Sequence, residues 1–351
     1  MGTAIIYTPR YLDHRTGGRH PERPRRLTAI INGILESRLI ETGCIRLIEP
    51  RSASMEDLES IHKAEHINRV RSICSAGGGL LDEETEVSAE SFDVAIMAAG
   101  GAIEAVERVI SGEFSNAFAL IRPPGHHAGP DYSEGFCIFN NVAIAARYLQ
   151  RKHGLERILI LDIDTHHGNG TQDIFYDTSS VLYMSIHEDP REFPGTGFIW
   201  EVGAGEGRGY TVNIPLPYGS GDPAYWRAMK TVVLPIAEQY RPQFILVSAG
   251  FDGYYRDGIG NLALSAQIYP KIFGVIHDLA HKVCGGRLVA VLEGGYNTWL
   301  LRRAAAACIA RMAGMAIKIM DRRPPINLAA QKGAEKIIEA VKRVQSRYWS
   351  I

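Results

Sequence analysis

The sequence has 351 residues, of which 46% are hydrophobic and 22% charged, so the chain can bury a large core and is not disordered. Lysine and arginine number 38 against 39 aspartates and glutamates. The resulting formal charge of -1 excludes the global positive field that holds a nucleic-acid backbone. The five cysteines are scattered and form no CxxC pair, which excludes a disulfide scaffold.

Residues 1–10 form a short apolar run without the charged and apolar regions of a signal peptide, and no apolar stretch approaches the roughly 18 residues of a membrane helix. We therefore expect a cytoplasmic protein with no membrane partner and no nucleic-acid partner. The histidines are unevenly placed, because six of the twelve lie between residues 126 and 187, four of them as the adjacent pairs 126/127 and 166/167. That clustering is the first indication of a functional site.

Short runs rich in Ile, Val and Leu recur along the chain and predict buried strands. They cover residues 3–7, 117–121, 157–161, 181–185, 211–214, 244–248 and 288–292. Longer segments with helical spacing lie between them, for example residues 95–110, 142–152, 225–239 and 268–282. This alternation predicts an α/β fold of three layers, with helices on both faces of a mostly parallel sheet.

No repeat, low-complexity tract or linker divides the sequence, so we expect a single domain over residues 1–351, with its core at about residues 3–315. Near the end of the sequence, apolar residues at helical spacing alternate with lysines and arginines. This pattern predicts an amphipathic helix at about residues 331–349. We expect the helix to dock on the domain or on a second subunit of a homo-oligomer.

Chemically active side chains follow most of the predicted strands. In chain order they are His126 and His127, then Asp162, Asp164 and His166, then His187, Asp252 and Tyr296. In open α/β sheets, ligands bind beyond the carboxyl ends of the strands. The sequence therefore predicts an active site at one edge of the sheet.

Two of these residues, Asp164 and His166, are spaced so that both side chains can point to one metal ion, and Asp252 can supply a third ligand. Two carboxylates and one imidazole with an open fourth position are typical of catalytic zinc, although iron or cobalt would also fit. Each aspartate taken singly could instead be a helix N-cap. The combination of residues favours the metal site.

Adjacent His126 and His127 follow a rigid Pro-Pro-Gly turn and are candidates for the base and the acid of a hydrolase. Asp162 and Asn169 could bond the far ring nitrogens of these histidines. Tyr296, on a Gly-Gly turn, could donate a hydrogen bond to a developing oxyanion. The alternatives are two surface histidines in a loop and a tyrosine that only packs.

Several longer motifs resemble the zinc-dependent histone deacetylase superfamily, which includes acetylpolyamine amidohydrolases and acetoin-utilisation proteins. They are GGRHPERPRRLTAI (17–30), RPPGHHAGPDYSEGFCIFNN (122–141), LDIDTHHGNGTQDIFY (161–176), HEDPREFPGTG (187–197), SAGFDGYYRDGIGNL (248–262) and LEGGYN (292–297). The resemblance spans residues ~3 to ~315. LEGGYN and the Asn of HHGNG are more similar to the class II branch than to class I.

The resemblance implies an arginase-like fold with a central eight-stranded parallel sheet, and zinc held by Asp164, His166 and Asp252. It implies that water on the zinc attacks the acetamide carbonyl while Tyr296 stabilises the oxyanion. His127 would be the base and also the acid, with His126 as an electrostatic partner, although these two roles could be exchanged. Asp162 and Asn169 would orient the two histidines.

The resemblance also implies a substrate channel and potassium sites. Phe136 and Phe193 would flank an acyl-lysine chain, and the Gly135 carbonyl would accept the amide N–H of the substrate. A first potassium site would use Asp162, Asp164, His166, Ser185 and Ile186, and a second would use Phe175, Thr178, Val181 and Tyr210.

Substrate selectivity is expected at Ile259, where polyamine-selective members carry a glutamate. An apolar residue offers no recognition of a second ammonium group, so acetylated lysine in a protein or peptide is favoured over an acetylated polyamine. The run Asp82-Glu83-Glu84-Thr85-Glu86 could attract a basic substrate, although a solvated loop is the simpler interpretation. Of the arginines in residues 19–26, Arg26 could help acetate to leave.

Two other classes of function compete with this one. The run LDIDT at 161–165 is similar to the nucleophile motif of haloacid-dehalogenase-type, magnesium-dependent phosphatases, with Asp252 and Asp257 as later acidic residues. That interpretation leaves the HHGNG, PPGHH and EGGY motifs unexplained. A catalytically inactive relative that binds acylated ligands is the second alternative, but it should have lost a metal ligand or the tyrosine, and neither is missing.

Overall fold

The centre of the computed structural model, which describes residues 2–351, is an eight-stranded sheet in which all strand pairs are parallel. The strands follow the order β2-β1-β5-β10-β9-β6-β7-β8. Their bounds in chain order are β1 Thr3–Ile6, β2 Ile45–Ile48, β5 Asn116–Ala119, β6 Ile158–Asp162, β7 Val181–Glu188, β8 Thr211–Leu216, β9 Phe244–Ala249 and β10 Leu288–Leu292. A separate antiparallel pair joins β3 (Gly78–Leu80) to β4 (Glu86–Ser88).

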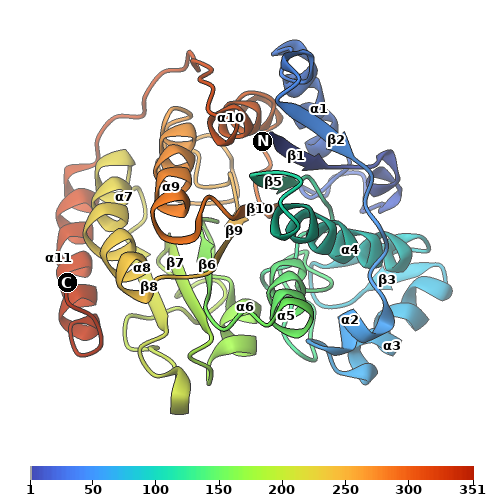
Figure 1. The fold of residues 1–351 in the computed structure, drawn as a ribbon, viewed down its shortest axis with the longest axis horizontal. Helices are drawn as coiled ribbons and strands as arrows, with labels where there is room; N and C mark the ends of the chain where they lie inside the picture. The colour runs from blue at the N-terminus through green and yellow to red at the C-terminus, as the bar shows by residue number, and fades with distance from the viewer. Residues whose placement is uncertain (1) are drawn as a thin grey trace.

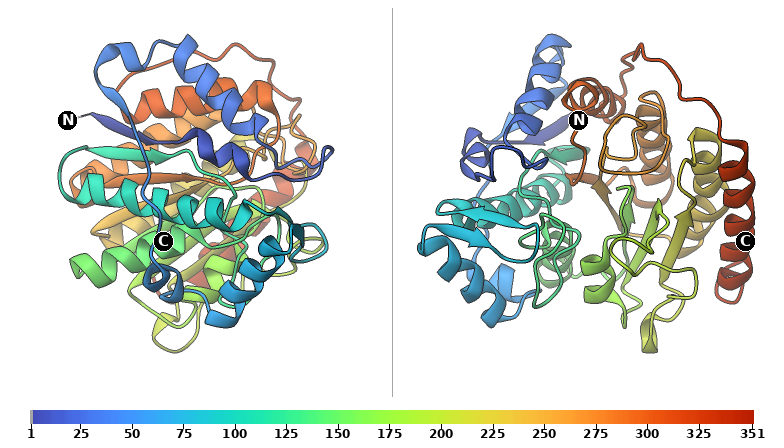
Figure 2. Two further views of the ribbon diagram at one scale, coloured as in Figure 1. Left: turned by 90° about the vertical axis from the view of Figure 1, so that its right-hand side faces the viewer. Right: turned by 180° about the vertical axis from the view of Figure 1, so that it is seen from behind.

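Helices cover both faces of the sheet, as the alternating pattern predicts. Figure 1 shows α9 and α10 on one side and α4 and α5 on the other, and the views of Figure 2 show the same layers. The α-helices are α1 Arg25–Glu36, α2 Met55–Glu59, α3 Ala64–Ser75, α4 Ser91–Ile110, α5 Asn141–His153, α6 Asn169–Phe175, α7 Asp222–Ala228, α8 Leu234–Tyr240, α9 Ile268–Cys284, α10 Thr298–Met312 and α11 Leu328–Gln345. Short 3-10 turns, η1 Pro9–Asp13, η2 Ile40–Thr42 and η3 Gly205–Gly207, complete the connections.

All seven strands expected from the apolar runs are present, and the sheet is fully parallel rather than mostly parallel. Strand β2 was missed by the sequence pattern. It lies at the edge of the sheet and pairs only with β1, and its central residues Arg46 and Leu47 are exposed. A short edge strand with an exposed middle therefore lacks the continuous apolar run of a buried strand.

The helix expected over residues 225–239 is divided, which is a correction to the sequence interpretation. A π-helical turn, η4 (Met229–Val233), separates α7 from α8. Pro235 follows this turn, and because proline has no N–H to donate, the regular α-helical hydrogen-bond ladder cannot pass through it.

The C-terminal amphipathic helix, α11, begins three residues earlier than expected and ends four residues earlier. Asn327 caps it by accepting the backbone N–H of Ala330, and the helix packs against β8 at the edge of the sheet. The Gln345 side-chain amide donates to the Thr211 carbonyl at 3.0 Å, and the Trp349 indole donates to the Gly209 carbonyl at 2.8 Å. The helix therefore docks on its own domain. Within residues 2–351, no helix is both long and apolar enough to cross a bilayer.

Candidate active site

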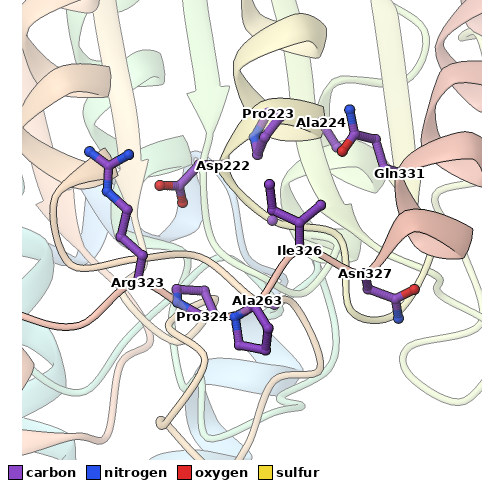
Figure 3. Close-up of a pocket in the computed structure, with 11 residues that line it drawn as sticks. Asp222, Pro223, Ala224, Ala263, Arg323, Pro324, Ile326, Asn327 and Gln331 are labelled. Atoms are coloured by element: carbon purple, nitrogen blue, oxygen red, sulfur yellow. The ribbon is translucent and has the colours of Figure 1, made fainter.

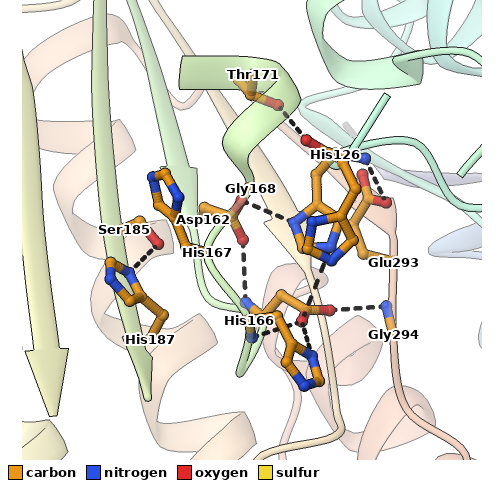
Figure 4. Close-up of polar contacts among 12 residues, drawn as sticks. His126, Asp162, His166, His167, Gly168, Thr171, Ser185, His187, Glu293 and Gly294 are labelled. Carbon is orange, nitrogen blue, oxygen red and sulfur yellow. Dashed lines mark hydrogen bonds and ion pairs between the residues drawn. The ribbon is translucent and has the colours of Figure 1, made fainter. Parts of the chain in front are cut away.

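Loops after four strands place the candidate residues at one edge of the sheet. The two adjacent histidines follow β5, the metal-ligand pair follows β6, Asp252 follows β9 and Tyr296 follows β10. Strands β5, β10, β9 and β6 are neighbours in the sheet, so their carboxyl ends meet. Figure 4 shows polar contacts in one part of this site, around His126, Asp162 and His166.

The candidate metal ligands Asp164, His166 and Asp252 converge, and their ligand atoms lie within 4.8 Å of one another. His166 Nδ1 lies 3.5 Å from Asp164 Oδ1 and 3.3 Å from Asp252 Oδ2. Both carboxylates are almost fully buried, whereas His166 is slightly exposed on the open side. The group therefore has two enclosed carboxylates and one side open to a substrate.

The carboxylate of Asp252 has an oxygen that the protein itself does not satisfy. Its Oδ1 accepts the Thr165 N–H at 3.0 Å, but its Oδ2 is buried and makes no hydrogen bond. Burial, followed by the charge of Asp164, raises the pKa of Asp252 to about 7. A buried oxygen without a partner costs stability unless a cation or a donor binds it, so the donor set fits a metal ion with a preference for nitrogen and oxygen ligands.

The far ring nitrogens of the adjacent histidines have different partners. His126 Nδ1 donates to Asp162 Oδ2 at 3.0 Å, and His127 Nδ1 donates to Asn169 Oδ1 at 2.8 Å. The Asn169 amide is oriented by its own N–H group, which donates to Glu134 Oε2 at 2.5 Å. Because the amide oxygen thus faces His127, the proton of His127 is held on Nδ1 and the Nε2 lone pair is free.

These partners separate the pKa values of the two histidines. Burial alone would lower the pKa of His126, but the negative charges of Asp162 and Asp164 outweigh it and raise this pKa to about 10. Burial and then the charge of His126 hold the pKa of His127 well below its ordinary value. The two shifts have opposite directions and favour a protonated His126 beside a neutral His127 at neutral pH.

Tyr296 lies on a turn that is held from two sides. The Asp257 carboxylate accepts the backbone N–H groups of Tyr296 and Asn297 at 2.7 and 2.8 Å. The buried Arg26 donates to the carbonyls of Gly295 and Glu293, and its guanidinium lies 4.9 Å from the centre of the Tyr296 ring. Burial raises the pKa of the phenol well above its ordinary value, so the hydroxyl keeps its proton and can donate it in a hydrogen bond.

Three comparisons with known proteins agree with this geometry. The histone deacetylase domain matches residues 20–312. A probable deacetylase from Archaeoglobus fulgidus is 44% identical over 358 residues and covers 99% of both chains. The chain belongs to the histone deacetylase family. A histone deacetylase-like amidohydrolase from Pseudomonas aeruginosa is 38% identical over 303 residues, which are 86% of this chain and 78% of the relative.

The fold comparison supports the same family. The crystal structure of the HDA15 HD domain matches with a TM-score of 0.89 and 34% identity, over 99% of this chain and 95% of that one. This deacetylase-family chain is accordingly a hydrolase that acts on amides.

The phosphatase alternative fails on geometry as well, because its nucleophile would be Asp162, which is fully buried and hydrogen-bonded to His126 and Tyr183.

One buried acid of the deacetylase site was missed by the sequence analysis. Glu293 Oε2 accepts the backbone N–H groups of Gly125 and His126 at 2.7 and 3.2 Å, which ties the histidine loop to the end of β10 (Figure 4). Burial raises the pKa of Glu293 to about 7. The signal was present in LEGGYN, because a glutamate directly after a buried strand is unusual unless backbone donors surround it.

The expected channel residues surround the open side of the ligand group. The Phe193 ring lies 4.9 Å from the His127 ring and 5.6 Å from the His166 ring, and Phe136 meets Tyr296 edge-on at 5.8 Å. Gly135 has a φ of 56°, and a side chain there would approach His127 to 2.5 Å. The position therefore requires glycine, both for its positive φ and for the space that His127 occupies.

The rim of the site differs in part from the expectation of a solvated acidic loop. Thr85 is buried, and its hydroxyl accepts the Phe136 N–H at 3.1 Å, while the Glu84 carbonyl lies 3.0 Å from His20 Nε2. Thr85 thus holds the run beside Phe136, whereas Glu83 and Glu84 are exposed to solvent. Ile259 is 39% exposed, which leaves it accessible to a substrate.

Two histidines of the cluster have structural partners instead of a place among the metal ligands. His167 contacts Thr196 and Gln172 at 3.0 and 3.1 Å, and His187 contacts Ser185 Oγ and the Gly197 carbonyl at 2.8 and 2.9 Å. Burial lowers the pKa of His187 to about 4, so this ring is neutral. Both rings brace the loop that carries Phe193.

The two residue sets named for potassium lie around β6 and β7. In the first set, Asp162 is paired directly with Ser185 in the strand register, next to Ile186. The second set lies at the start of β7, where the Phe175 carbonyl accepts the Thr178 N–H at 3.4 Å and the Tyr210 carbonyl accepts the Tyr183 N–H at 2.9 Å, close to Val181.

A separate cavity of about 100 Å³ lies between the start of α7 and residues 323–327 (Figure 3). Its lining is mainly apolar and includes Pro223, Ala224, Ala263, Pro324 and Ile326. No candidate catalytic residue lines this cavity, so it is distinct from the site at the strand ends.

Proposed function

We propose that the protein is a zinc-dependent deacetylase that hydrolyses the acetamide of acetylated lysine side chains or related acylated amines and releases acetate. One observation carries the proposal: an unsatisfied carboxylate oxygen of Asp252 faces His166 and Asp164, close to the neutral base His127. A buried donor set beside a base and a phenol is what metal-assisted amide hydrolysis needs.

Asp164, His166 and Asp252 would hold the metal. When bound, zinc polarises the scissile carbonyl and lowers the pKa of water at the site. Ferrous iron or cobalt fits the same two-carboxylate, one-imidazole set, so the resident metal is part of what must be measured. Potassium is proposed at the two sets around β6 and β7, where carbonyl and carboxylate oxygens gather.

His127 would take the proton of the attacking water at Nε2, because Asn169 keeps its other proton on Nδ1. The same nitrogen can then deliver the proton to the leaving amine. Burial and then the nearby charge of His126 keep the pKa of His127 low, so His127 releases the proton readily. Asp162 would hold His126 in its charged state.

Tyr296 would donate its hydroxyl hydrogen bond to the oxyanion that develops on the carbonyl oxygen. Arg26 and Asp257 fix the turn that carries it, so the hydroxyl needs no large movement when the charge develops. Arg26, which is fully buried against this turn, acts in our proposal mainly by positioning.

An acyl-lysine would enter between Phe136 and Phe193, whose rings offer apolar walls for its methylene chain. The backbone carbonyl of Gly135 would accept the amide N–H of the substrate. Ile259 at the rim offers no charge to a second ammonium, which favours acyl-lysine in a protein or peptide.

An acetylpolyamine is the second candidate substrate, and a specific observation favours it. The acidic turn at residues 82–86 packs beside Phe136 at the edge of the site instead of standing clear of it. Carboxylates beside the entrance of the channel could attract the second ammonium group of a polyamine.

The deciding experiment is a side-by-side kcat/KM series on acetyl-lysine peptides, acetylputrescine, acetylspermidine and longer acyl-lysines, with enzyme of measured metal content. A higher kcat/KM on acetyl-lysine peptides supports acyl-lysine as the substrate. A higher kcat/KM on acetylspermidine would instead identify an acetylpolyamine as the substrate. Metal-loaded protein without turnover on the entire panel would contradict both and favour an inactive acyl-ligand binder.

A further inference from the structure

Two histidines on α9 (orange in Figure 1) lie one helical turn apart and outside the candidate active site. His277 and His281 are four residues apart, a spacing that places side chains on the same helix face. Their Nε2 atoms are 3.2 Å apart and their ring centres 4.5 Å apart. His281 is exposed and His277 is partly buried, so the pair lies at the protein surface.

The separation of these two nitrogens suits joint coordination of one metal ion. Zinc–imidazole bonds measure about 2.0–2.1 Å, and two such bonds at a tetrahedral angle place the nitrogens about 3.3 Å apart. The pair is within about 0.1 Å of that separation. Nickel, copper and cobalt accept the same imidazole ligands.

The surroundings of His277 favour a neutral ring with its lone pair on Nε2, where it can accept the hydrogen bond from His281 or bind a metal ion. His277 Nδ1 lies 3.6 Å from the Asp278 carboxylate, which favours the proton on Nδ1. Burial, and then His281, lowers the pKa of His277, so this ring is uncharged at neutral pH, as a ligand must be. His281 lies in the last turn of α9, where the helix end carries partial negative charge.

Nearby charged side chains both favour and oppose a cation bound to the pair. Arg311 acts on His277 from α10 and disfavours an added cation, whereas Asp278 favours one. Lys282 is engaged with Glu238 of α8 at 2.7 Å, which reduces its effect. The pair therefore combines two nitrogen ligands with one acid and one opposing arginine.

We propose that His277 and His281 form a surface site for a divalent transition-metal ion, with water as the remaining ligands. The site is separate from the ligand group of Asp164, His166 and Asp252. Because the ion would bridge two successive turns of α9, its binding stabilises the folded state, and this stabilisation increases with the logarithm of the free metal concentration once that exceeds Kd.

The test is a titration of untagged full-length protein, with its resident metal content measured, with NiCl₂. Calorimetry should detect one Ni²⁺ bound per chain in addition to the resident metal, and Tm should rise with Ni²⁺ concentration. His281→Gln and His277→Asn should each weaken the added Ni²⁺ binding about tenfold or more and abolish the rise in Tm. Elemental analysis should show that the resident metal stays bound.

His153→Gln is the matched control, because His153 is a partly exposed helical histidine that pairs with Glu107 at 3.0 Å instead of with another histidine. It should leave Ni²⁺ binding unchanged. Wild-type Ni²⁺ binding in His281→Gln would overturn the proposal, as would the absence of added Ni²⁺ on the wild-type protein. If His277→Asn does not fold, the exposed His281→Gln decides the question alone.

Discussion

The Asp257 carboxylate accepts the backbone N–H of Tyr296 at 2.7 Å, and the same oxygen accepts the next N–H along the chain at 2.8 Å. Asp257 thus holds the turn that aims the phenol without touching the phenol itself. Arg26 holds the other side of the turn by donating to the backbone carbonyls of Gly295 and Glu293. The position of the Tyr296 turn accordingly depends on two residues far from it in the sequence.

Asp257→Asn should therefore lower kcat while KM changes little. The neutral amide retains an oxygen but loses the charge that attracts both N–H groups, so the phenol is less accurately placed, at a cost of about tenfold or more in kcat. Steady-state kinetics on an acetyl-lysine peptide measure both constants. Asp131→Asn, at an exposed pair with Lys63, is the control. Unchanged kcat in Asp257→Asn would show that the turn is held without the charge.

Tyr296→Phe should lose most of kcat, on the order of 10²-fold or more, because the oxyanion loses its hydrogen-bond donor. Its metal content should remain that of the wild type, since Tyr296 is not among the proposed ligands. Kinetics together with elemental analysis separate the two effects. Activity near the wild-type level would remove Tyr296 from the mechanism.

His127→Ala should lose kcat by a similar factor, on the order of 10²-fold or more, because no other neutral imidazole lies in its place. His187→Ala is the control, because it removes a neutral histidine that only braces the neighbouring loop. Its loss of kcat should be smaller than that of His127→Ala. A larger loss of kcat in His187→Ala than in His127→Ala would contradict the assignment of the base.

The acid limb of the pH profile should move in Asn169→Asp. In the wild type the pKa of His127 is held low, so we expect activity to fall only at a pH acidic enough to protonate this ring. An aspartate 2.8 Å from its Nδ1 stabilises the protonated form and raises that pKa, so the fall in kcat/KM should begin at a higher pH. Profiles of both proteins from pH 5 to 9 test this. Superimposable acid limbs would mean that His127 is not the titrating base.

Asp252→Ala should lose the active-site metal, because the variant removes the carboxylate whose buried Oδ2 makes no hydrogen bond in the protein. Elemental analysis of the purified variant measures the loss directly. Asp189→Ala, at a partly buried aspartate paired with the exposed Arg191, should retain the metal. Full metal content in Asp252→Ala would show that the metal binds at another site.

Ile259→Glu should shift selectivity toward acetylspermidine. The position is 39% exposed, so a new charge pair is screened and should change the ratio of kcat/KM values by up to about fivefold. Ile259→Gln controls for the loss of the apolar side chain. An equal ratio in the Glu and Gln variants would place the selectivity of the enzyme at another position.

The sequence by itself determined the strand runs, the parallel α/β class and the set of chemically active residues after the strands, because burial and ligand chemistry leave local signals. Tertiary structure alone decided which of these residues meet. The Arg26 contacts with Glu293 and Gly295 join residues more than 260 positions apart. The exposed edge strand β2, the backbone donors around Glu293 and the separation of the histidine pKa values likewise depend on neighbours distant in the chain. Such contacts form only when the sheet brings its strand ends together, so no local pattern of residues encodes them.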